Sequence, residues 1–179
     1  MLARFLRKKS VKLAARRIYD QLSLAARDPS LYGVGKVADS PDGRFELLAL
    51  HAAVVFTRLS KRGEQSDETS QEVFDILFSA MDHALRELGV GDIAVGKRIR
   101  KLAESFYGRL AVYHEGIAGY AESPDALVLA IATHVLDEPD AIPFFAQKLA
   151  VRVMEWTSGL AALNDETLLT GDMSLPHST

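Results

Sequence analysis

Apolar side chains recur every three or four residues along most of the chain, and this spacing constrains the fold more than any other feature. An α-helix turns once in about 3.6 residues, so the spacing gives each segment one apolar face. The alternation of apolar and polar residues that indicates a half-buried strand persists nowhere. We therefore predict an all-α protein, a single helical domain of about six helices, over residues 2–27, 43–60, 67–88, 92–118, 124–136 and 138–164.

Proline, glycine and polar residues set the expected boundaries. Asp28-Pro29 ends the first helix, and a loop rich in proline and glycine follows it. The segment 43–60 is apolar most of the way round, which predicts a central helix. Residues 61–70 are polar and predict a connector, and Pro143 predicts a kink in the sixth helix. The last fifteen residues lack helical spacing, so we expect an irregular or mobile tail over 165–179.

Positive charge is concentrated at the amino-terminal end. The first seventeen residues contain seven Lys and Arg and no acid, which leaves 14 bases against 24 acids in the rest of the chain. We divide the chain into a basic amphipathic segment, residues 1–17, and a helical domain, residues 18–164. The basic segment suits a mitochondrial presequence, an attachment to an anionic membrane surface or a ribosome, or a solvated helix without a role. Near an anionic leaflet each cation contributes about 1 kcal/mol, and the candidate contacts are Arg4, Arg7, Lys8, Lys9, Lys12, Arg16 and Arg17.

Several functional classes are excluded by what the sequence lacks. Without cysteine, the chain forms no disulfide, thiolate zinc site, iron–sulfur cluster or cysteine nucleophile. No two histidines are three to five residues apart, so the helical zinc motif is missing, and no Gly-x-Ser-x-Gly elbow occurs. The net charge of −3 argues against specific DNA binding. We expect no catalytic residue, no cofactor and no metal.

The helix predicted over 92–118 contains the candidate partner contacts. Four bases occur in five residues near its start, where cations oppose the helix dipole. These bases either form a solvated face that pairs with acids of the acidic body, or bind a partner. Such a partner would be anionic or a nascent chain. Farther along, Tyr107 and Arg109 have the composition of a binding hot spot, although hydrogen bonding at the edge of the core explains them equally well. The candidate contacts are Lys97, Arg98, Arg100, Lys101, Tyr107, Arg109 and Tyr113.

A second class of function remains open at this point. A small-ligand-binding helical bundle, or an enzyme, would use a pocket near His51 and Asp82. A deep closed cavity with convergent polar groups would favour that interpretation. A broad apolar groove with bases at its rim would favour a chaperone that binds a protein client.

Residues between about 17 and 120 follow an ordered pattern. The first part begins at Ile18-Tyr19 and continues through Ala26-Arg27-Asp28-Pro29 and Gly43-Arg44-Phe45-Glu46 to Arg58-Leu59. The second part begins at Met81-Asp82 and continues through Gly89-Val90-Gly91-Asp92 to Phe106-Tyr107-Gly108-Arg109 and Tyr113. This ordered set resembles the ubiquinol–cytochrome c chaperone family. The candidate motif residues within it are Asp39, Arg44, His51, Asp82, Arg86 and Asp92.

The resemblance implies a non-catalytic assembly factor for the ubiquinol–cytochrome c reductase (bc1) complex. Its client would be newly made cytochrome b, and a second assembly protein remains an open partner. A membrane-protein client and the basic amino-terminal segment together predict peripheral attachment to the inner membrane. The short start of the chain favours a bacterial cytoplasm over the matrix side of a mitochondrion.

Overall fold

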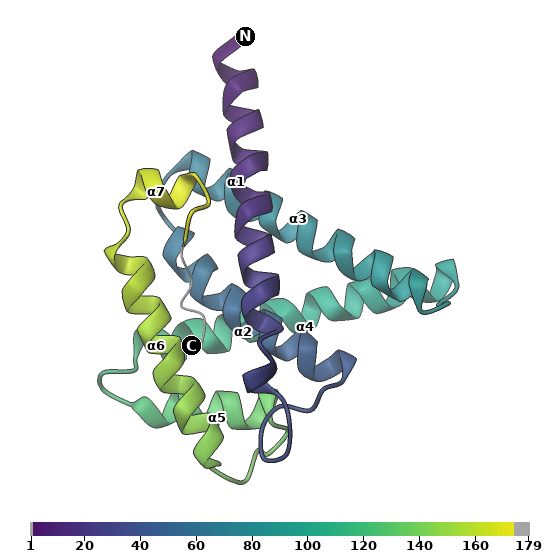
Figure 1. Ribbon diagram of the computed structural model, residues 1–179, viewed down its shortest axis with the longest axis vertical. Coiled ribbons are helices and arrows are strands. Elements are labelled where there is room, and N and C mark those ends of the chain that lie inside the picture. The colour runs from purple at the N-terminus through teal and green to yellow at the C-terminus, as the bar shows by residue number, and fades with distance from the viewer. Residues whose placement is uncertain (1, 174–179) are drawn as a thin grey trace.

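The computed structural model describes the backbone of residues 2–173 and the side chains from Leu6 onward. Within these residues the chain forms seven α-helices and one 3-10 helix, and no β-strand (Figure 1). The prediction of a single all-α domain is confirmed. The elements are α1 (Leu2–Ala26), η1 (Pro29–Leu31), α2 (Pro41–Leu59), α3 (Glu64–Glu87), α4 (Asp92–Ala118), α5 (Pro124–Val135), α6 (Phe144–Ala162) and α7 (Asp165–Leu169).

Helix α2 lies at the centre of the fold, as its nearly continuous apolar surface predicts. It contacts α1, α3, α4, α5 and α6, and most of its side chains are buried. Pro41 occupies its first turn, and the Ser40 hydroxyl accepts a hydrogen bond from the Gly43 backbone N–H at 3.1 Å. This cap satisfies one of the free amide groups at the helix start. Helices α1, α3, α4, α5 and α6 pack around α2, whereas α7 packs against α3.

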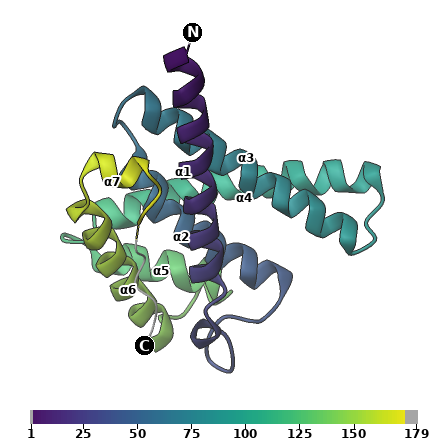
Figure 2. The same cartoon turned by 45° about the horizontal axis from the view of Figure 1, so that its top comes forward.

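Helices α3 and α4 form a two-helix arm that projects from the body (Figures 1 and 2). The sequence predicts them as neighbours because their link contains only a few residues around Gly89. In the structure Gly89 adopts a φ of 79°, which allows the tight turn. At the root of the arm, an aromatic cluster joins the two helices. Phe78 lies 5.5 Å from Phe106 in an edge-on arrangement, and Phe74 stacks on Tyr107 at 5.2 Å between ring centroids. Beyond this cluster the two helices extend together away from the body (Figure 1).

Two boundaries differ from the sequence-based expectation. The polar connector predicted over residues 61–70 is wrong, because α3 already begins at Glu64. Ser66 and Thr69 are buried there, and the Ser66 hydroxyl donates to the Leu59 carbonyl oxygen at 2.7 Å. Helix α6 begins only at Phe144, so Pro143 precedes the helix and does not kink it.

The carboxyl-terminal segment also differs from the expected irregular tail. It contains α7, whose first turn is capped by the Asn164 side-chain oxygen, and it continues as a segment packed on α1. Gly171 adopts a φ of 77° and lies so close to α1 that a Cβ atom there would come within 2.5 Å of the Ala14 carbonyl oxygen. The Gln21 side chain donates to the Gly171 carbonyl oxygen. Residues 174–179 of the expected tail lie outside the described residues.

Candidate functional site

The four bases near the start of α4 all face solvent. Lys97, Arg98, Arg100 and Lys101 are exposed, whereas Ile99 on the same two turns is partly buried against the core. Among the described residues, no acid forms an ion pair with any of the four. The interpretation that acids of the body neutralise this cluster is therefore not supported, and its positive charge is available to a partner.

The three candidate contacts farther along α4 have different surroundings. Arg109 forms a bidentate ion pair with Glu46 of α2, with N–O distances of 2.8 and 2.9 Å. The hydrogen-bonded Glu46 carboxylate raises the pKa of Arg109. This ion pair joins α4 to α2 at the edge of the core, so it explains Arg109 as a structural residue. Tyr113 is fully buried, burial raises its pKa, and the expectation that it contacts a client is wrong. Tyr107 is 56% exposed and remains a surface residue.

Two glycines lie on the exposed side of α4 among these residues. A Cβ atom added at Gly96 or Gly108 would meet no other atom within 4 Å. Glycine permits a second backbone to pack closely, but no other described segment of the chain lies against these two glycines. Exposed apolar side chains flank these positions at Ile93, 84% exposed, and Val112, 39% exposed. We call this surface the α4 outer face, and it consists of Ile93, Gly96, Lys97, Arg98, Arg100, Lys101, Tyr107, Gly108 and Val112.

The candidate motif residues are dispersed over the molecule. Asp39 and Arg44 form an exposed ion pair at 2.8 Å beside the start of α2. At the end of the arm, Arg86 of α3 pairs with Asp82 on its own helix and with Asp92 of α4, which joins the two helices across their turn. The Arg86 guanidinium lowers the pKa of Asp82. This ion pair and this triad explain local structure, and neither lines a pocket with His51.

His51 lies in the core and not in a site shared with Asp82. Its ring packs 4.2 Å from that of Trp156 on α6, and its Nδ1–H donates to the Leu47 carbonyl oxygen at 2.6 Å. Burial lowers the pKa of His51 to about 4, so the imidazole is neutral near pH 7. Asp82 is on the projecting arm. The proposed pocket near His51 and Asp82 is therefore not formed.

The basic amino-terminal segment divides into paired and unpaired cations. Arg7 binds Glu64 and Glu68 of α3 at 2.8 Å each. Arg16 pairs with Asp20 at 3.1 Å, and Arg17 donates to the Thr170 carbonyl oxygen at 3.2 Å. The side chain of Arg4 lies outside the described side chains. Three cations remain, Lys8, Lys9 and Lys12, which are exposed and form no ion pair or side-chain hydrogen bond with another described residue.

Leucine side chains accompany these unpaired lysines, a feature that the charge count alone did not show. Leu6 is 55% exposed and Leu13 is 54% exposed. At 100° per residue they lie on the solvent side of α1, beside the lysines and opposite the buried Val11 and Ala14. We call this surface the α1 outer face, and it consists of Leu6, Lys8, Lys9, Lys12 and Leu13.

Two other features are absent from the part of the chain that the structure describes, a metal-binding cluster and a membrane-spanning helix. There, no three His, Asp or Glu side chains gather closely enough to hold a metal ion. No helix in those residues has the length and hydropathy needed to cross a membrane. The candidate sites described above are two exposed surfaces, the α4 outer face and the α1 outer face.

Comparisons with known proteins agree with the resemblance in the sequence. The model of the family described as ubiquinol–cytochrome C chaperone matches residues 34–175. A search of curated proteins finds no significant match. The crystal structure of the Cbp3 homolog from Brucella abortus is similar, with 33% sequence identity and a TM-score of 0.83, over 98% of this chain and 97% of that one. From this match over most of its length, and from the shared helical fold, the chain belongs to the ubiquinol–cytochrome c chaperone family.

Proposed function

We propose that this chain is a non-catalytic chaperone that binds newly made cytochrome b and promotes assembly of the bc1 complex. The observation that carries the proposal is the family match, which spans residues 34–175 and includes all of α4. The exposed, unpaired bases of α4 provide a surface on which a protein client can bind without displacing an internal ion pair. Aromatic side chains and arginine of this kind dominate the binding energy of protein interfaces.

The shape of the α4 outer face suits a helical client. The open positions at Gly96 and Gly108 allow the backbone of a second helix to approach closely. Ile93 and Tyr107 offer apolar area beside them. Small residues of this kind are common where transmembrane helices pack together. A cytochrome b helix that has not yet met its own neighbours is an apolar partner of that kind.

Charge reversal at Lys97, Arg98, Arg100 and Lys101 is expected to lower the recovery of cytochrome b about tenfold or more. The measurement is affinity capture of the tagged full chain from the native host, with bc1 subunits quantified in the eluate. The melting temperature should not fall, because these side chains form no ion pair to lose. Acidic residues near a helix start are also favourable for the helix dipole.

The matched control is charge reversal at the three exposed lysines Lys8, Lys9 and Lys12 of α1. When the purified variant is added to detergent-solubilised membranes of the host, its own attachment to the membrane plays no part, so it should capture cytochrome b as the unmodified chain does. Equal loss in both variants would show that the effect is one of total charge. Loss of client together with loss of melting temperature in the α4 variant would assign the cluster a structural role. Unchanged recovery would remove the α4 outer face from the proposal.

We further propose that the α1 outer face attaches the chaperone peripherally to the cytoplasmic side of the inner membrane, or to a ribosome near it. Removal of residues 1–17 is a poor test, because Val11 and Ala14 are buried and Arg7 holds α3. Replacement of Lys8, Lys9 and Lys12 by glutamine leaves those contacts in place. We expect membrane partitioning to weaken about 100-fold, counting about fivefold for each lysine. Cell fractionation measures this, and unchanged membrane association would contradict it.

A further inference from the structure

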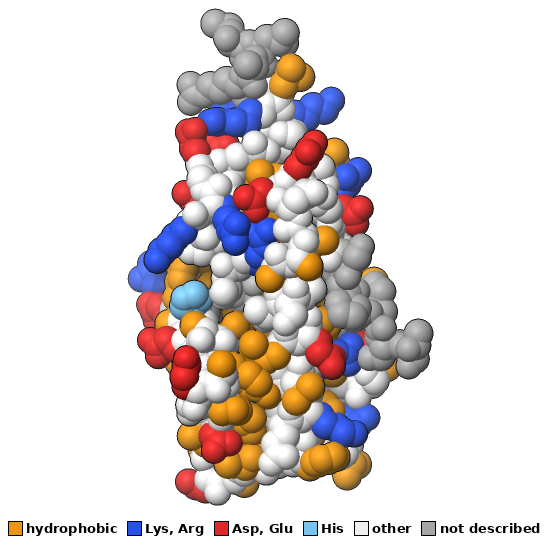
Figure 3. All heavy atoms as spheres, turned by 90° about the vertical axis from the view of Figure 1, so that its left-hand side faces the viewer, with side chains coloured by type: hydrophobic (Ala, Val, Ile, Leu, Met, Phe, Trp, Pro, Cys, Tyr) orange, Lys and Arg blue, Asp and Glu red, His pale blue; other side chains and the backbone are white. Residues whose placement is uncertain are grey.

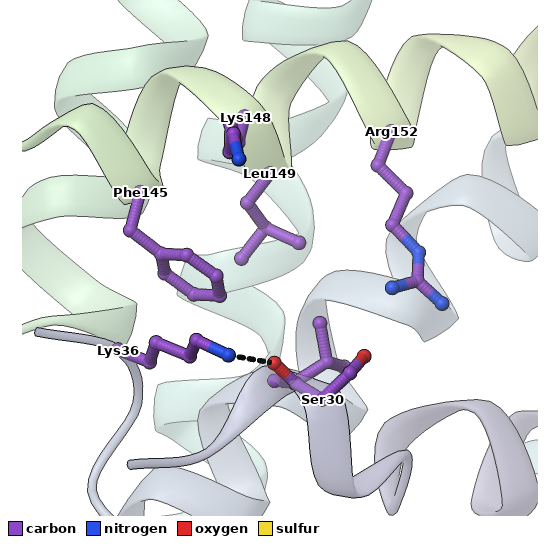
Figure 4. A pocket seen from close by; sticks show the side chains of 7 residues that line it. Ser30, Lys36, Phe145, Lys148, Leu149 and Arg152 are labelled. Atoms are coloured by element: carbon purple, nitrogen blue, oxygen red, sulfur yellow. Dashed lines mark hydrogen bonds between the residues drawn. The ribbon is translucent and has the colours of Figure 1, made fainter. Parts of the chain in front are cut away.

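A small basic pocket lies between the loop after η1 and the first turns of α6. Its volume is about 290 Å³, and its lining comes from Ser30, Leu31, Lys36, Phe145, Lys148, Leu149 and Arg152. In Figure 4, Lys36 and Arg152 lie on opposite sides of the pocket, the Phe145 ring lies beside Lys36, and the Leu149 side chain lies between the two sides. This volume is at the lower end of the range for ligand sites, about 300–1,000 Å³. The pocket therefore suits a small group such as a phosphate.

Cations outnumber acids at this pocket. Lys36, Lys148 and Arg152 line it, and Asp28 is the acid that contacts one of them, with an N–O distance of 2.9 Å to Arg152. Lys36 uses one donor on the Ser30 carbonyl oxygen at 2.8 Å. Since an ammonium has three donors and a guanidinium five, most N–H groups of these three side chains remain available. The surplus of positive charge favours an anion in the pocket.

Large apolar side chains are exposed beside these cations. Val34, at 105% exposure, forms the tip of the loop that supplies Lys36. Its neighbours Gly33 and Gly35 have φ values of 127° and 69°, which let the chain turn tightly there. Near the start of α6, Phe144 is 70% exposed.

The face of the molecule that contains α6 shows this arrangement more broadly. In Figure 3, hydrophobic side chains gather over its lower half, and both basic and acidic side chains lie around them. Ile142, just before α6, is 49% exposed, and Val151 in its second half is 51% exposed. An anion free in water gains nothing from these side chains. A lipid whose phosphate enters the pocket brings an apolar region next to them.

We propose that this pocket binds the phosphate headgroup of an anionic phospholipid in a membrane, with Val34 and Phe144 entering the acyl boundary. The three cations bind the phosphate oxygens, and the two exposed apolar side chains lose their contact with water. Burial of apolar area adds to electrostatic attraction at membrane surfaces. This inference does not depend on cytochrome b binding or on the α1 outer face, because it uses none of their residues.

The single tryptophan of the chain offers a local signal for this test. Trp156 lies on α6 with the Arg152 guanidinium 5.0 Å from its ring centroid. A ligand that engages Arg152 therefore changes the fluorescence of Trp156, whereas binding at α1 does not. We would titrate the purified full chain with dihexanoyl phosphatidylglycerol, dihexanoyl phosphatidylcholine and inorganic phosphate, each below any micelle concentration. The expected result is a saturable change with phosphatidylglycerol at concentrations where the other two give none.

Variants assign the signal to residues of the pocket. K36Q/K148Q changes two exposed lysines and keeps the Arg152–Asp28 pair, and it should weaken phosphatidylglycerol binding about 30-fold. V34S/F144S should weaken binding of the lipid and of vesicles that contain it. K97Q/K101Q, which removes the same charge from α4, should leave the titration unchanged. Thermal melting of each variant verifies that the fold is intact.

Three results would overturn the proposal. A saturable phosphate titration as strong as that of phosphatidylglycerol would mean a site for the free anion. Equal binding of phosphatidylcholine would mean that the cations do not select the ligand. An equal loss in K36Q/K148Q and K97Q/K101Q, or no fluorescence change with phosphatidylglycerol, would mean that the pocket is not a lipid site. Capture of cytochrome b by the same variants is measured separately, so failure here leaves the proposed function intact.

Discussion

Replacing Trp156 by alanine is expected to lower the free energy of unfolding by about 3–5 kcal/mol, the usual range for loss of a buried aromatic side chain. The indole is 1% exposed and packs on the His51 ring, so its removal leaves a cavity between α2 and α6. Its Nε1 has no hydrogen-bond partner among the described residues, so the loss comes from packing. Urea denaturation followed by circular dichroism measures it, because tryptophan fluorescence is lost with the residue.

Val151→Ala is the matched control on the same helix. Val151 is 51% exposed, so its truncation opens no cavity, and the change should stay within about 0.5 kcal/mol. If Trp156→Ala cost less than about 1 kcal/mol, the packing of α6 on α2 would not be as described. A chain that fails to fold at all would support the central place of this contact, and Trp156→Phe would then provide a measurable intermediate.

Acidification is expected to destabilise the protein through His51, by about 3 kcal/mol between pH 6.5 and pH 4. The pKa of His51 is lowered from 6.5 to about 4 because burial penalises the imidazolium, and Arg152 acts in the same direction, whereas Asp28 opposes it. As the pH falls below 6.5, the unfolded chain takes up a proton that the folded chain does not. Stability is therefore present above pH 6.5 and is lost progressively as the pH falls toward 4.

His51→Leu removes this titration and is the variant to compare. Its stability at pH 7 includes the lost hydrogen bond to Leu47, so the informative quantity is the difference in pH dependence between the two proteins. Urea midpoints measured from pH 7.5 to pH 4 give it directly. His134 retains a smaller effect, since burial lowers its pKa as well. Parallel pH profiles in the two proteins would show that His51 is not the group responsible.

Much of the fold follows from local signals in the sequence. The two segments around Gly89 are predicted as neighbouring helices because a short link leaves them no other arrangement. Helix α2 is predicted as central because it has almost no polar side. Both predictions use the spacing of apolar residues and the residue types at turns. These signals involve residues only a few positions apart in the chain. The start of α3 has no such local signal, because the polar Ser66 is buried through a hydrogen bond to the Leu59 carbonyl oxygen of another helix.

The candidate site was predicted less completely than the fold. The sequence draws attention to the bases of α4 and to Tyr107, which the structure places on the surface. It left two interpretations open for Arg109, and only the distance to Glu46, 63 positions away, decides between them. It also placed Tyr113 among the contacts, although its ring is buried. The basic pocket had no local signal, since Lys36 and Lys148 are far apart in the chain.

The order of residues is enough to predict the helical class, the apolar face of each helix and the excess of bases at the amino-terminal end. These properties depend on residue types and on spacing within a few turns, which the order of residues expresses directly. Which charges are neutralised and which remain available depends on how the helices pack against one another. Arg7 is paired and Lys8 is not, because Glu64 and Glu68 come into reach of one side of α1 only when α3 packs against it. Pairing depends on distances between residues far apart in the chain, and folding sets those distances.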